Sequence, residues 1–175
     1  SMFYFASLYT QDILGYDPLK AGLAFLPVSV GIIVGAVAAQ QLIGRVGVRA
    51  VGTAGLMIAT AGMILLTGIT PAGTYLGSLL IGLGPLSIGI GLTFVPITLL
   101  ATANVSDEDA GLASGLYNTS QQIGGALGLA ILSTLAADKT TSALMVLGRA
   151  PAAADRAAAT VDGFQVAFIG GAIAL

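Results

Sequence analysis

Long apolar stretches separated by short polar ones dominate this chain. No Asp, Glu, Lys or Arg occurs in residues 21–44, 50–106 or 110–137. An α-helix needs about 20 apolar residues to cross a bilayer, whereas a transmembrane β-strand needs only about 9–11 of alternating polarity. Apolar helices in the core of a very large soluble protein are the alternative. The pattern predicts an all-α fold, a polytopic bundle of transmembrane helices.

Turn-forming residues divide this pattern into six predicted spans, because Gly, Pro, Asp and Asn clusters interrupt helices. Complete spans are predicted at residues 21–43, 51–69, 75–103 and 110–136, and truncated ones at 2–14 and 164–175. Both ends of the chain are therefore expected to lie within spans.

The connections between the predicted spans are short, with one exception. Residues 44–49 are predicted to form a tight polar loop, and residues 137–163 an Ala-rich charged loop that is helical in part. Pro85 and Pro96 fall inside the span at 75–103, and interior prolines remove backbone hydrogen bonds. We expect that span to tilt or kink.

Composition agrees with a membrane environment and excludes several functions. Of the 175 residues, 56% are hydrophobic and 8% are charged, against about 25% charged in soluble domains. There is no Cys or His, and the net charge is −2. The sequence has no catalytic triad, carboxylate pair, phosphate loop or metal-ligand spacing. We therefore expect no enzyme activity, no cofactor, no metal and no nucleic-acid partner, and the lipid bilayer as the surroundings.

Glycine is unusually frequent, with 25 residues. In lipid, small residues four positions apart allow two helix backbones to approach closely. Three such pairs are predicted to serve helix packing: Gly31 and Gly35, Gly111 and Gly115, and Gly124 and Gly128.

The predicted span at 110–136 has two different faces when its residues are placed at about 100° intervals. One face carries Gly111, Gly115, Asn118, Gln122 and Gly125, and the other carries Leu112, Leu116, Ile123 and Leu127. Amides at membrane depth need partners, so Asn118 and Gln122, with Gln121 at their border, either bond to neighbouring helices or line a water-filled cavity. Gln11 and Thr93 are further uncharged candidates for such a cavity.

Four segments carry a family resemblance. They are residues 9–27 (YTQDILGYDPLKAGLAFLP), 44–49 (GRVGVR), 89–96 (GIGLTFVP) and 110–128 (AGLASGLYNTSQQIGGALG). In order and spacing they resemble the second half of the fourteen-span drug–proton antiporters of the major facilitator superfamily, and the first and last are the more specific. The chain departs from the family pattern at Gly44, where the family has an acid, and at Gln121, where it commonly has an arginine.

The resemblance implies most of one six-helix lobe of a multi-pass plasma-membrane transporter, whose N-terminal lobe is missing from this sequence. Such a protein exports hydrophobic or cationic small molecules in exchange for protons by alternating access. The resemblance places Arg45, Gly47 and Arg49 in a cytoplasmic loop. No acid or base lies deep within a complete predicted span, so a proton-carrying residue is expected outside this chain. Two alternatives remain: a transporter of another solute with the same architecture, and a non-transporting membrane scaffold or sensor.

Overall fold

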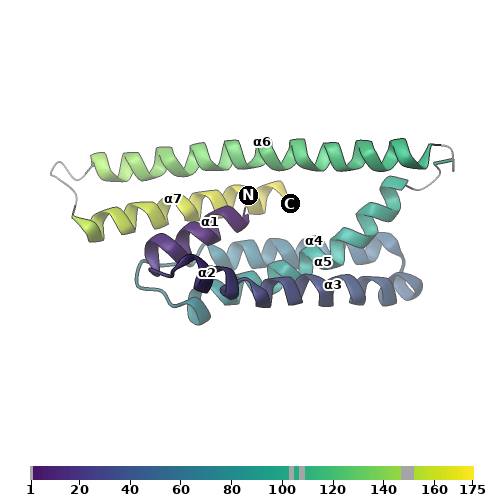
Figure 1. Ribbon diagram of the computed structural model, residues 1–175, viewed down its shortest axis with the longest axis horizontal. Coiled ribbons are helices and arrows are strands. Elements are labelled where there is room, and N and C mark those ends of the chain that lie inside the picture. The colour runs from purple at the N-terminus through teal and green to yellow at the C-terminus, as the bar shows by residue number, and fades with distance from the viewer. Residues whose placement is uncertain (1, 103–104, 107–108, 147–151) are drawn as a thin grey trace.

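The computed structural model describes residues 2–102, 105–106, 109–146 and 152–175. All regular structure within these residues is helical, which confirms the predicted all-α class. The helices are α1 (Met2–Leu8), α2 (Pro18–Ala24), α3 (Leu26–Val46), α4 (Val48–Leu66), α5 (Leu80–Thr102), α6 (Ala110–Met145) and α7 (Ala153–Ala174), with π-helical turns η1 (Tyr9–Ile13) and η2 (Tyr75–Leu79). They form an elongated bundle with α6 along one side (Figure 1).

Four stretches are long and apolar enough to cross a membrane. They are Pro18–Val46, Val48–Leu66, Tyr75–Ala101 and Ala153–Ala174. Helix α6 is not among them, although residues 110–136 are predicted as a complete span, because amides in its first half and charges near its end make it more polar. Conversely, α7 qualifies, although the sequence predicts only a truncated span from residue 164.

The first of these stretches is two helices rather than one. Pro18 occupies the first turn of α2, as predicted, and the Asp17 carboxylate accepts a hydrogen bond from the Lys20 backbone N–H at 2.9 Å. The helix then breaks at Phe25, whose N–H bonds to the Gly22 carbonyl at 3.1 Å, and α3 begins just before Pro27. The break follows from Pro27, which has no N–H to continue the α-helical ladder.

The connection between α3 and α4 is a single residue. Gly47 has a φ of 87°, a left-handed conformation that glycine adopts without steric cost. Arg45 lies in the last turn of α3 and Arg49 in the first turn of α4. The predicted loop at residues 44–49 is therefore almost entirely helical, and Gly47 alone reverses the chain.

The predicted loop at residues 137–163, expected to be helical in part, is helical in most of its described residues. Helix α6 continues to Met145 and α7 starts at Ala153, while residues 147–151 lie outside the described residues. Alanine favours helix strongly, so an Ala-rich stretch can be too polar for the membrane and still helical. With 36 residues, α6 is about 54 Å long, well over the ~30 Å hydrocarbon core. Helix α6 is therefore longer than a spanning helix needs to be, and Asp138 and Lys139 lie near its C-terminal end. Asp155, Arg156 and Asp162 lie on α7, within the stretch that can cross a membrane.

Helix α5 is the centre of the bundle and packs between α3 and α4. Small residues make this possible. A Cβ added at Gly35 would lie 2.3 Å from the Ile88 carbonyl oxygen, and one at Gly89 would lie 2.4 Å from the Ala59 nitrogen. Figure 1 shows the last turns of α5 rising toward the start of α6. Pro85 and Pro96 both lie inside this helix.

The end of the bundle near the turn after α4 is closed by aromatic packing and long-range hydrogen bonds. The Phe5 ring contacts Phe164 and Phe168 of α7, with centroids 5.7 and 6.2 Å apart. The Tyr9 hydroxyl donates to the Thr70 carbonyl at 2.7 Å, and the Gln165 amide donates to the Ile69 carbonyl at 2.8 Å. These contacts fix α1, η1 and α7 to the turn after α4.

Candidate functional site

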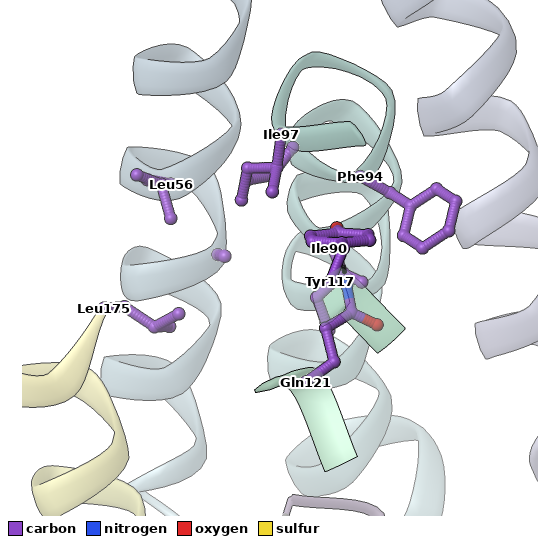
Figure 2. A pocket seen from close by; sticks show the side chains of 9 residues that line it. Leu56, Ile90, Phe94, Ile97, Tyr117, Gln121 and Leu175 are labelled. Carbon is purple, nitrogen blue, oxygen red and sulfur yellow. Dashed lines mark hydrogen bonds between the residues drawn. The ribbon is translucent and has the colours of Figure 1, made fainter. Parts of the chain in front are cut away.

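A small pocket opens where α4, α5 and α6 approach one another. Its volume is about 220 Å³. It is lined by Leu56, Ala59, Ile90, Thr93, Phe94, Ile97, Tyr117, Gln121 and Leu175. Figure 2 shows Leu56, Ile97 and Leu175 converging from three helices, with the Phe94 ring on the side of α5 turned away from Leu56. Drug-sized ligand pockets usually measure about 300–1,000 Å³, so this pocket alone is too small for such a ligand.

Three polar side chains border the pocket, and each has an internal partner. The Thr93 hydroxyl, which is almost fully buried, donates to the Gly89 carbonyl at 2.8 Å. On α6, the Gln121 amide donates to the Tyr117 hydroxyl at 2.5 Å. Thr93 and Gln121 are thus the two predicted cavity residues that the structure brings together. Tyr117 is not among the predicted residues, although it precedes Gln121 by one helical turn.

Asn118 and Gln122, the central predicted candidates, do not line this pocket. Both side chains are exposed, and neither makes a hydrogen bond to another described residue. Of residues 110–127, only Ala113 and Tyr117 are partly buried, and these two face α5 rather than the amide face. The leucines on the opposite face are also exposed, for example Leu112 at 74% and Leu116 at 66%. The first half of α6 therefore carries two different, uncovered faces.

Gln11 lies elsewhere. It belongs to η1, its side chain is exposed, and its amide donates to the Ser7 hydroxyl at 3.0 Å. It lines none of the surface around Thr93 and Gln121. The structure therefore does not unite all the predicted cavity residues in one site.

The predicted packing glycines separate into two groups. Gly31 and Gly35 lie against α5, where added Cβ atoms would meet Ser87 and Ile88. In contrast, Cβ atoms added at three glycines of α6 would meet no heavy atom within 4 Å. These three are Gly111, Gly115 and Gly124. Close packing at these three glycines would have to involve atoms outside the described residues. Gly128, which was predicted to pack together with Gly124, is half-buried.

Two observations concern the charged and the potentially metal-binding side chains of the described residues. The side chains of Arg45 and Arg49 are exposed at the Gly47 end of the bundle. Among the described residues, no group of three or more His, Cys, Asp or Glu side chains is arranged to hold a metal ion. The described part of the chain thus presents surfaces for binding and packing.

The helices, their apolar spans and the uncovered polar face of α6 define a multi-pass helical membrane protein. Residues 1–129 match the sequence profile of the Major Facilitator Superfamily, and the chain belongs to that family.

Several proteins that are similar to this chain are named for resistance or export. The chain is 40% identical to the puromycin resistance protein of Streptomyces alboniger, over 95% of this chain and 33% of that protein. It is 39% identical to the cephamycin export protein of Amycolatopsis lactamdurans, over 80% and 29% respectively. It is 33% identical to the tetracenomycin C resistance and export protein of Streptomyces glaucescens, over 78% and 25%. The chain spans about a third of the length of the first of these proteins.

Proposed function

We propose that the full-length protein carrying this chain exports small hydrophobic or cationic molecules across the plasma membrane. In this proposal the chain forms most of one six-helix lobe of a fourteen-span transporter, and a second, N-terminal lobe covers the first half of α6. The proposal is carried by the similarity to resistance and export proteins over most of this chain.

The shape of the described residues supports a shared substrate path rather than a site within this lobe. The pocket beside Tyr117 is smaller than drug-sized sites, at about 220 Å³. Meanwhile Asn118 and Gln122 are exposed on a helix whose nearby glycines have open space around them. In family members with two lobes, substrates bind between the lobes near the bilayer midplane. We therefore assign Asn118 and Gln122 to the path between lobes, with Gln121 at its border.

An accumulation assay tests the export activity. The full-length protein is expressed in a drug-sensitive bacterium, and the uptake of puromycin, a cephamycin, tetracenomycin C and ethidium is measured. We expect lower accumulation of at least one compound than in cells that express the Gly35→Leu variant, in which helix packing is disrupted. Equal accumulation of every compound in both strains would contradict export of this class of molecule and favour another solute.

Proton exchange is a separate part of the proposal. We place the proton-carrying acid outside this chain, because no acid or base lies deep within a complete predicted span. In proteoliposomes, an imposed pH gradient should drive uptake of the exported compound, and a protonophore should abolish it. Transport that persists unchanged without a gradient would exclude proton exchange while leaving the export activity intact.

A further inference from the structure

A second surface feature lies between α4 and the end of α5. A groove of about 280 Å³ runs along the two helices from the Gly47 end of the bundle. Its lining includes Arg49, Gly52 and Leu56 of α4 and Pro96, Ile97 and Leu100 of α5. At Leu56, Thr93 and Ile97 it joins the small pocket of Figure 2, which extends to Ala59.

The groove is apolar except at one end. Its two hydroxyl side chains, Thr53 and Thr93, donate hydrogen bonds to carbonyls of their own helices, at 2.9 Å to Arg49 and 2.8 Å to Gly89. The Arg49 guanidinium makes no ion pair or hydrogen bond with another described side chain. Arg49 therefore places, at the end of an apolar groove, a cation that has no ion-pair partner among the described residues.

Together, the groove and the pocket that it joins match one leaflet of a bilayer in length. From Arg49 to Ala59 the helix advances ten residues, or about 15 Å. The hydrocarbon core of a bilayer is about 30 Å thick, so half of it is about 15 Å. Both α4 and α5 belong to stretches that can cross the membrane, and Arg49 lies at the very start of its helix. Arg49 is thus at headgroup level, and the far end of the adjoining pocket, at Ala59, is near the midplane.

We propose that this groove binds an anionic phospholipid, with its phosphate at Arg49 and an acyl chain along Gly52, Leu56 and Ile97. Charge complementarity selects the headgroup, because a basic residue at the membrane surface attracts anionic lipids. Gly52 forms part of the groove wall where α4 lies close to α5: a Cβ added there would lie 3.3 Å from the Pro96 Cβ. The site is distinct from the amide face of α6 and does not depend on the exported compound.

Brominated lipids that quench tryptophan fluorescence test this site in the full-length protein. The 175 residues contain no Trp, so Leu100→Trp places a reporter at the rim of the groove once any other tryptophans have been removed. Met57→Trp is the control reporter, because Met57 lies on α4, the other helix of the groove, is 74% exposed and does not line the groove. Quenching is compared between vesicles of brominated phosphatidylglycerol and brominated phosphatidylcholine.

We expect the Leu100→Trp reporter to favour phosphatidylglycerol about fivefold, and the Met57→Trp reporter to show almost no preference. Arg49→Gln should abolish the preference at Leu100→Trp, whereas Arg45→Gln, which removes the same charge outside the groove, should keep most of it. Gly52→Leu should reduce quenching at Leu100→Trp by both lipids, since the side chain occupies the groove.

Three results would overturn the proposal. Absence of quenching at Leu100→Trp would mean that protein covers the groove. Equal quenching by the two lipids would remove the role of the headgroup charge. An equal loss of preference in Arg49→Gln and Arg45→Gln would assign the effect to the general surface charge. Export measured in parallel keeps this outcome separate from the proposed transport activity.

Discussion

Helix α5 and the first half of α6 both place glycines at intervals that allow close packing, yet their surroundings differ completely. A Cβ added at Gly91 of α5 would lie 2.2 Å from the Ile32 carbonyl oxygen, in the contact with α3. A Cβ added at Gly115 of α6 would meet nothing within 4 Å. The spacing of small residues thus marks a helix that is able to pack closely, while the position of a neighbouring helix decides whether it does.

The polar side chains of the two helices differ in the same way. On α5, the hydroxyls of Ser87 and Thr93 donate to carbonyls of their own helix, both at 2.8 Å. Asn118 and Gln122 on α6 have no hydrogen-bonding partner among the described residues. An amide without a hydrogen-bonding partner in lipid costs free energy. Helix α5 is complete within this bundle, whereas α6 requires water or another partner.

The largest effect is expected at the α3–α5 contact. Gly35→Leu forces a side chain against the backbone of α5, where the Gly91 Cα lies 3.1 Å from the added Cβ position. We expect a loss of about 3 kcal/mol in the free energy of unfolding and little folded protein. Folded protein is measured by size-exclusion chromatography in detergent. Gly22→Leu is the matched control, because a Cβ at Gly22 meets nothing within 4 Å, and equal yields of the two variants would refute the close contact.

The same substitution on α6 is expected to separate folding from transport. Gly115→Leu should change the free energy of unfolding by less than about 1 kcal/mol, because no described atom is near the added side chain. If a second lobe covers this face, efflux per folded molecule should fall to about a tenth, the change that about 1.4 kcal/mol produces. Normal efflux together with normal folding would show that this face is not closely covered.

A smaller and more selective effect is expected at the amides. Asn118→Leu and Gln122→Leu should alter the relative efflux of at least one compound about fivefold, since desolvating an amide costs about 1–3 kcal/mol. Expression should remain nearly intact, because both side chains are exposed. Leu116→Ala, on the opposite face, serves as the control. Unchanged relative efflux in both amide variants would defeat their assignment to a substrate path.

The smallest effect is expected at Thr93. Thr93→Val keeps the shape of the side chain against Gly55 and removes only the hydrogen bond to the Gly89 carbonyl. We expect a decrease of about 1 kcal/mol or less in the free energy of unfolding, measured by thermal unfolding in detergent, and no change in the set of exported compounds. A change in that set would place Thr93 on the substrate path and weaken the contrast between α5 and α6.

Several features of the fold could be predicted from the sequence because they depend on local chemistry. Charge-free stretches located α3, α4 and α5, and Pro18 marked the start of α2. Membrane helices must satisfy their backbone hydrogen bonds internally, so hydrophobicity and length suffice to find them.

Other features depend on contacts between distant segments and could not be predicted. The two faces of α6 follow from helical periodicity, but no periodicity tells which face a neighbour covers, so Gly31 and Gly111 look alike in sequence. Tyr117 lines a pocket together with residues of α4 and α5, which are distant from it in the sequence. Residues 137–163 were predicted to be helical only in part, and the continuation of α6 to Met145 was not predicted, because Asp138 and Lys139 disfavour the membrane while the alanines favour helix.

The one-residue turn at Gly47 also bears on how the protein is made. Arg45 and Arg49 lie on either side of this turn. The connection between α3 and α4 is too short for one helix to cross the bilayer while the other remains outside it. Moving either arginine through the hydrocarbon is costly, and basic residues near helix ends hold a connection on one side of the membrane. The two helices must therefore leave the translocon and enter the lipid together, as a hairpin, during biosynthesis.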